Sequence, residues 1–150
     1  MHYQQLKPEN QLCLPFYAVS RLIIRAYQED LDRLGITYPQ YLVMMVLWEK
    51  DGISVNEIAE KLILNTNTVT PLLKRMEAMQ LITRTPSTMD QRKIIIQLTS
   101  QGWAMRESAA EIPLKLMNKL NLEVSDAQIA EALHLKNKLY VSLHLNMLYD

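Results

Sequence analysis

Cysteine and long apolar stretches are the scarcest features of this 150-residue sequence. Its one cysteine, Cys13, excludes a disulfide within the chain and suits a reducing compartment. No run of about 18 uninterrupted apolar residues is present, and the N-terminal residues lack the charged head and apolar stretch of a signal peptide. We therefore expect a cytoplasmic protein without a membrane partner. Its apolar content of 49% is sufficient for the core of one compact domain.

An excess of either charge is also missing. Sixteen basic and sixteen acidic side chains give a formal net charge of zero. This speaks against a nucleic-acid partner, because DNA binding uses Lys and Arg to neutralise phosphates. The segment 65–93 differs, since five basic residues stand against two acidic ones, a local excess of three. An ordinary solvated surface gives the same count, so charge alone favours DNA binding only slightly.

Glycine is scarce as well, with three residues, and apolar residues mostly recur every three or four positions. This pattern predicts a mainly helical chain. We expect a first helix from about Asn10 to Leu34, ended by Gly35. A second helix, from Tyr38 to about Lys50, is nearly all apolar and should be buried on most sides. Two further helices are expected over about 100–120 and 125–146.

The segment 54–99 has the pattern of a winged helix-turn-helix. Ser54-Val-Asn-Glu57 is a capping box that opens a short helix. After a break near Asn65, an amphipathic segment turns five apolar residues inward: Val69, Leu72, Leu73, Met76 and Met79. Residues 81–85 and 92–98 then follow as strands around a polar turn. The sequence therefore predicts a mainly α fold with a small β-hairpin wing.

Polar and basic side chains of this segment are the candidate DNA contacts. The second helix of such a motif enters the major groove, and the hairpin reaches the backbone or the minor groove. Short polar side chains near a helix N-terminus suit phosphates and base edges. We expect Arg92 to be oriented by an ion pair with Asp90 and inserted into a narrow minor groove. The full set is Thr66, Asn67, Thr68, Thr70, Lys74, Arg75, Arg84, Asp90, Arg92 and Lys93. A solvated surface explains any one of them equally well.

The first and last helices carry more apolar side chains than one domain needs. They are Leu12, Phe16, Val19, Ile23 and Ala26 in the first, and Leu133, Leu139, Leu143 and Leu145 in the last. Buried core helices are one interpretation, and a dimer bundle is the one we favour. In that interpretation 1–150 is a single domain, 1–34 and 100–150 form the homodimer, and 54–99 binds double-stranded DNA.

Four motifs resemble the MarR family of winged-helix regulators, and within it the organic-hydroperoxide-resistance regulators. They are Glu9-Asn-Gln-Leu-Cys13, Ile36-Thr-Tyr-Pro-Gln-Tyr-Leu42 with Leu47-Trp-Glu49, Thr68-Val-Thr-Pro-Leu-Leu-Lys74 and Asp90-Gln-Arg92. The first two are specific to the peroxide-sensing branch. The resemblance implies a sequence-specific DNA-binding repressor of the one-cysteine type, not an enzyme, with no cofactor. It also implies that Cys13 is the redox sensor and that Tyr27 and Tyr38 hydrogen-bond to it.

The chemistry of Cys13 agrees with this role. Only a thiolate attacks a peroxide, and the partial positive charge of the first helical turn stabilises a thiolate. Tyr27 lies fourteen residues further on, about 21 Å along the same helix. It can therefore reach only the Cys13 of the other subunit. An organic hydroperoxide is the expected inducer, and release of the operator follows oxidation to sulfenic acid. Without a second cysteine, a small cellular thiol caps the oxidised sulfur, or overoxidation follows.

Other interpretations remain open at this point. An isolated cysteine is more often a buried structural residue, and only the motif match reverses those odds. A reactive cysteine also suits a thiol peroxidase, although none of the three histidines, His2, His134 and His144, is spaced as a catalytic or metal pair with it. The inducer could instead be an aromatic acid bound between the dimer helices and the DNA-reading segments. A global regulator with the same cysteine switch is a further alternative.

Overall fold

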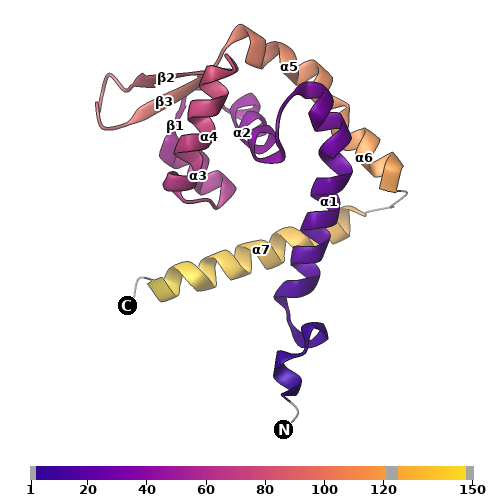
Figure 1. Cartoon of the computed structure of the whole chain (residues 1–150). Helices are drawn as coiled ribbons and strands as arrows, with labels where there is room; N and C mark the ends of the chain where they lie inside the picture. Colours follow the sequence, from indigo (N-terminus) through magenta and orange to yellow (C-terminus); the bar gives the residue numbers. More distant parts are fainter. Residues whose placement is uncertain (1–2, 121–124, 148–150) are drawn as a thin grey trace. The chain divides into compact units, whose positions relative to one another are not determined.

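The computed structural model describes residues 3–120 and 125–147, and all side chains in these ranges except those of 120 and 144–147. The chain divides into two compact units, the second beginning at Met117. Helices dominate both (Figure 1). In chain order the elements are η1 (Gln4–Leu6), η2 (Pro8–Asn10), α1 (Cys13–Leu34), α2 (Tyr38–Glu49), β1 (Ile53–Ser54), α3 (Val55–Leu62), α4 (Thr66–Ala78), β2 (Ile82–Pro86), β3 (Ile94–Leu98), α5 (Ser100–Ala110), α6 (Ile112–Leu120) and α7 (Asp126–Met147).

Helix α1 is one continuous helix of 22 residues. Gly35 ends it in the left-handed conformation, with φ 70°, as the sequence predicts. The start is three residues later than the predicted Asn10, because Gln11 is extended and separates η2 from the helix. Pro15 therefore lies in the first turn, where its missing N–H removes no helical hydrogen bond. Cys13 is the first residue of the helix.

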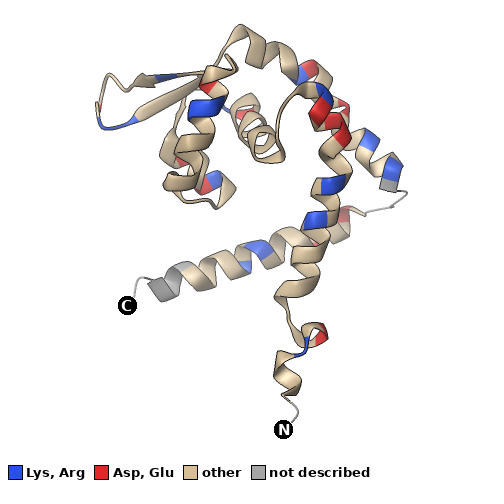
Figure 2. Cartoon of the chain, in the orientation of Figure 1, with Lys and Arg blue, Asp and Glu red and all other residues tan. Residues whose placement is uncertain are grey.

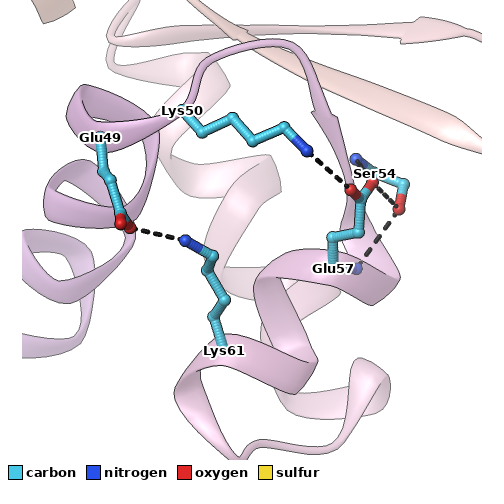
Figure 3. Close-up of polar contacts among 5 residues, drawn as sticks. All are labelled: Glu49, Lys50, Ser54, Glu57 and Lys61. Atoms are coloured by element: carbon cyan, nitrogen blue, oxygen red, sulfur yellow. Dashed lines mark hydrogen bonds and ion pairs between the residues drawn. The ribbon is translucent and has the colours of Figure 1, made fainter.

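Polar contacts fix α3 against the end of α2 (Figure 3). The Ser54 hydroxyl accepts from the Glu57 N–H at 3.3 Å, and the Glu57 carboxylate accepts from the Ser54 N–H at 2.9 Å. The predicted capping box is confirmed, and these bonds hold the pKa of Glu57 below its usual range. Two ion pairs, Lys50 with Glu57 and Lys61 with Glu49, join the two helices. Helix α3, the first helix of the predicted helix-turn-helix, is thereby attached to the core.

Three strands, not two, form the antiparallel sheet, in the order β1-β3-β2. The predicted hairpin is present, with Arg84 opposite Ile96, and it projects from the helices (Figure 1). Strand β1 pairs with the opposite edge of β3, where Ile53 lies across from Ile96. This added strand is only two residues long, which is too short to show the alternation that identifies a strand in a sequence. It attaches the base of the wing to the α2–α3 connection.

The core lies where α2, α3, α4 and the sheet meet. Six of the twelve residues of α2 are buried, which confirms that this helix is enclosed on most sides. The inward face of α4 is as predicted: Val69, Leu72, Leu73 and Met76 are buried, and Met79 packs half-buried against them. The outward face of α4 is consequently left to its polar residues.

The expected helix over 100–120 is wrong as a single element, because it breaks at Glu111 into α5 and α6. Pro113 is the physical reason, since it has no N–H to donate to the carbonyl of Ala109. Helix α7 begins as predicted: Ser125 and Gln128 form a second capping box, with bonds of 2.9 and 3.3 Å. Within residues 3–120 and 125–147, no helix is both long enough and apolar enough to cross a membrane.

Candidate nucleic-acid interface and redox site

The N-terminal turn of α4 presents the short polar side chains. The Asn65 side chain caps the helix by accepting from the Asn67 N–H at 2.9 Å. Asn67 and Thr68 are exposed, whereas Thr66 and Thr70 are half-buried. The Thr70 hydroxyl donates to the Thr66 carbonyl at 2.8 Å, so its lone pairs remain available as acceptors. The polar side chains around this turn form a surface that can receive a phosphate or a base edge.

Lys74 and Arg75 lie one to two turns further along α4, and both are exposed. Figure 2 shows basic positions on α4 and at the tip of the hairpin of β2 and β3. Acidic positions gather in the last turns of α1, away from that hairpin. The balanced net charge of the chain therefore conceals a basic surface on the helix and wing that the sequence predicts to meet DNA.

The wing tip is closed by hydrogen bonds. The Ser87 N–H donates to the Lys93 carbonyl at 2.8 Å, and the Lys93 N–H donates to the Asp90 carbonyl at 2.9 Å. The predicted ion pair between Asp90 and the Arg92 guanidinium is wrong for the described residues. The Asp90 carboxylate instead accepts from the Arg92 backbone N–H at 3.1 Å. Since a two-residue separation in a turn favours this local bond, Asp90 shapes the backbone and leaves the exposed Arg92 side chain free to point outward.

Arg84 differs from the other predicted DNA contacts. Its side chain is only 18% exposed, and its guanidinium lies 3.4 Å from the Glu77 carboxylate. The Nε atom is buried without a hydrogen-bond partner. The pair joins the end of α4 to β2. In this structure Arg84 thus fixes the wing relative to α4, whereas Lys93 and Arg92 are the exposed cations at its tip.

Cys13 is a free, exposed thiol at the start of α1. Tyr27 lies on the same uninterrupted helix, fourteen residues away. At 1.5 Å per residue the two are about 21 Å apart. The structure therefore does not bring Cys13 together with Tyr27 within one chain, in agreement with the geometric argument from the sequence.

Tyr27 and Tyr38 do come together, and two further aromatic residues join them. The ring centroids of Tyr27 and Tyr38 are 5.5 Å apart, and Tyr41 lies 5.9 Å from Tyr27. Trp48 meets the Tyr41 ring edge-on at 6.3 Å. We call Tyr27, Tyr38, Tyr41 and Trp48 the aromatic cluster. Tyr41 was not among the predicted site residues, although its three-residue spacing from Tyr38 indicates a shared face of α2.

The phenols of the cluster are protonated at neutral pH. Burial raises the pKa of Tyr38, and burial together with the neighbouring Tyr38 raises that of Tyr27. Burial, reinforced by the other two phenols, raises the pKa of Tyr41 to about 12. A protonated phenol can donate a hydrogen bond to an anion. Tyr27 and Tyr38 are half-buried and can be approached from outside, whereas Tyr41 is only 2% exposed.

The raised pKa of Tyr41 predicts a loss of stability at high pH. The unfolded chain releases this proton near pH 10 and the folded chain near pH 12, so the free energy of unfolding falls as pH rises between these values. In Tyr41→Phe protein the fall should be shallower. Urea unfolding at several pH values measures it, and Tyr17→Phe, an exposed ring on α1, corrects for the loss of a hydroxyl. A Tyr41→Phe profile parallel to that of the wild type would contradict the prediction.

One bond connects the aromatic cluster to α5. The Trp48 indole N–H donates to the Gly102 carbonyl at 3.0 Å. Gly102 itself packs against the chain between α4 and β2: a Cβ at this position would lie 2.2 Å from the Leu81 carbonyl oxygen. Thr99 closes the same junction by donating from its hydroxyl to the Gln80 carbonyl at 2.6 Å. Helices α2 and α5 and the base of the wing are thus in direct contact.

Comparisons with known proteins support the fold and a role in the regulation of transcription. Residues 25–108 match the family described as transcriptional regulator SarA/Rot. The chain is 40% identical over 143 residues to the organic hydroperoxide resistance transcriptional regulator of Bacillus subtilis. The matched residues cover 90% of this chain and 97% of the relative.

The solved structures of AbfR, a protein of Staphylococcus epidermidis, are similar over nearly the whole chain. Reduced AbfR bound to DNA superposes with a TM-score of 0.77 at 34% identity, covering 95% of this chain and 99% of AbfR. Overoxidised AbfR bound to DNA gives a TM-score of 0.78 at the same identity and coverage. The matched family and the Bacillus subtilis relative are thus transcriptional regulators, and AbfR has been seen on DNA in a reduced and an overoxidised state.

Proposed function

The chain belongs to the MarR family of winged-helix transcriptional regulators, with the SarA/Rot and organic hydroperoxide resistance regulators as relatives, and we propose that it is a homodimeric repressor released from its operator by organic hydroperoxides. Regulation of transcription through DNA is common to the matched relatives. The homodimer, the sign of regulation and the inducer are the proposal. The relatives are transcriptional regulators. We therefore infer that this chain controls DNA binding and does not catalyse a reaction.

The DNA-binding residues follow from the exposed surfaces of α4 and the wing. Helix α4 enters the major groove with Thr66, Asn67, Thr68 and Thr70 toward bases and phosphates, and with Lys74 and Arg75 toward the backbone. The wing brings Arg92 and Lys93 to the adjacent minor groove. Arg84 acts from within the fold by fixing the wing to α4.

The dimer is supported by apolar surface that each unit leaves exposed. Leu12 at the N-cap of α1, and Phe16, Val19 and Leu22 on the helix, are all more than half exposed. On α7, five of the large apolar side chains that the structure describes are at least 44% exposed: Ile129, Leu133, Leu139, Val141 and Leu143. Leu145, also predicted for this surface, lies outside the described side chains. Apolar surface of this extent is typical of an interface between subunits.

The position of Cys13 carries the sensing proposal. The thiol is exposed in the first turn of α1, where a hydroperoxide can reach it. The protonated phenols of Tyr27 and Tyr38 lie together. Within one chain Cys13 cannot reach them, because Tyr27 lies about 21 Å further along α1. In the proposed dimer, these phenols donate to the thiolate of the opposite subunit. Each sensing site is therefore built from two chains.

The redox step proceeds at the sulfur. The Cys13 thiolate attacks one oxygen of the hydroperoxide ROOH, the O–O bond breaks, and the alkoxide takes up a proton and leaves as the alcohol ROH. Sulfur is oxidised by two electrons to the sulfenic acid and loses the charge that the phenols recognise. A small cellular thiol then condenses with the sulfenic acid to give a mixed disulfide and water. The larger group displaces the tyrosines, and the two DNA-reading segments move apart.

A gel-shift experiment tests this function. Reduced protein should shift the DNA upstream of its own gene, and protein treated with cumene hydroperoxide and a small thiol should shift it about 10- to 100-fold less well, the range typical of coupled sites. Removal of the mixed disulfide with excess reductant should restore binding. Unchanged affinity after treatment, with Cys13 shown to be modified by mass spectrometry, would contradict the proposal.

Arg92→Ala should weaken operator binding about 10- to 100-fold, because it removes the exposed cation that the wing brings to the minor groove. Fluorescence anisotropy with labelled operator measures the change. Lys115→Ala is the control, since it removes a cation of α6 that is paired with Glu111 and lies outside the reading segment. Equal losses in the two variants would mean that Arg92 contributes only general charge.

A further inference from the structure

Met89 is an apolar side chain displayed at the wing tip. It is 96% exposed, the highest value of any large apolar residue whose side chain the structure describes. A flexible thioether surrounded by water contributes nothing to the core. The exposed side chain therefore either has no role or contacts a partner outside the chain.

The backbone around Met89 is held in place. The Ser87 hydroxyl accepts from the N–H groups of Met89 and Asp90, at 3.2 and 3.4 Å. The tip is closed on its other side by the bonds between Lys93 and both Ser87 and Asp90. The Met89 side chain is thus presented by a hydrogen-bonded turn in which Ser87 and Asp90 make the bonds.

The neighbours of Met89 identify the partner. Arg92 and Lys93 are exposed at the same tip and attract an anionic surface. The Asp90 carboxylate, which would repel phosphates, is bonded to the Arg92 N–H. The deoxyribose rings that line the minor groove offer Met89 apolar surface, and proteins that bind this groove use Met and similar apolar side chains there. A cationic tip with one apolar side chain fits that groove.

We propose that Met89 is a DNA-binding residue, which packs against the sugars of the minor groove beside the place where Arg92 enters. This rests on the wing docking of the proposed function. The contact adds an apolar contribution to affinity that does not depend on salt. Burial of about 60 Å² of its surface at about 25 cal/mol per Å² corresponds to roughly a tenfold gain in affinity.

The test compares the reduced wild type with Met89→Ala and Met89→Leu on operator DNA at several salt concentrations. Met89→Ala should bind about tenfold more weakly, and Met89→Leu, which keeps the apolar volume, within about threefold of the wild type. Both should keep the wild-type slope of log affinity against log salt. Arg92→Ala should lower that slope by about one.

Three results would overturn the proposal. The first is a Met89→Ala protein with wild-type affinity for the operator, and the second is a loss of affinity in Met89→Leu equal to that in Met89→Ala. The third is a Met89→Ala protein whose oligomeric state changes in sedimentation, since the side chain would then contact another copy of the chain. All measurements use reduced protein. A wild type that binds DNA and is not released by hydroperoxide would therefore contradict the sensing function. The Met89 variants would still test the proposed contact with DNA. Failure of the wild type to bind any DNA would contradict both.

Discussion

Cys13→Ser protein is expected to stay on its operator at hydroperoxide concentrations that weaken the wild type about 10- to 100-fold. Serine keeps about the size of the side chain and can still accept hydrogen bonds from the phenols of the opposite subunit, so the fold and the affinity for the operator without oxidant should not change. Its hydroxyl is not a nucleophile at neutral pH and cannot be oxidised by two electrons in this way. The variant separates sensing from binding.

The measurement is a titration of labelled operator with each protein, before and after hydroperoxide and thiol. The two proteins without oxidant are the control for folding, because they should bind the operator with equal affinity. Release of the Cys13→Ser dimer by hydroperoxide would mean that another residue senses the oxidant. Release of both proteins by an aromatic acid, without oxidant, would instead favour the ligand-induced alternative.

Gly102→Ala should lower the free energy of unfolding by about 2 to 3 kcal/mol. The added Cβ would lie 2.2 Å from the Leu81 carbonyl oxygen, and a backbone atom cannot rotate away as a side chain can. Helix α5 must therefore shift, which also stretches the bond from the Trp48 indole to the Gly102 carbonyl. The higher helix propensity of alanine returns at most about 1 kcal/mol.

Gly35→Ala is the matched control in urea unfolding. Gly35 has a φ of +70°, and no atom lies within 4 Å of the place that a Cβ would occupy, so the same substitution introduces backbone strain of about 1 to 2 kcal/mol without a clash. A larger loss at Gly102 than at Gly35 is expected. The opposite order would show that α5 adjusts easily at this junction.

Local signals in the sequence were sufficient for much of the fold. Ser54 and Glu57 define a helix start by their own hydrogen bonds, and Gly35 defines a helix end by its φ. The break at Glu111 could have been predicted from Pro113, but the apolar spacing on both sides of it continued the helical pattern. Strand β1 could not be found, because Ile53 and Ser54 form a strand only through their pairing with β3.

The candidate site was predictable where it depends on exposed residues of one element, and less so where it depends on packing. The outward face of α4 follows from its apolar face. The bond from Asp90 to the Arg92 backbone replaced the expected ion pair, because turn geometry decides it and residue type does not. Likewise the contact of the Tyr41 ring with Tyr27, and the pairing of Arg84 with Glu77, arise between separate elements.

The length of α1 has a consequence for mixed populations of the protein. In the proposed dimer, each sensor combines Cys13 of one chain with Tyr27 of the other, because one helix holds the two residues about 21 Å apart. A heterodimer of a Cys13→Ser chain and a Tyr27→Phe chain would then collect both defects in one sensor and leave the second intact. Two alleles that each fail alone would complement one another when expressed together.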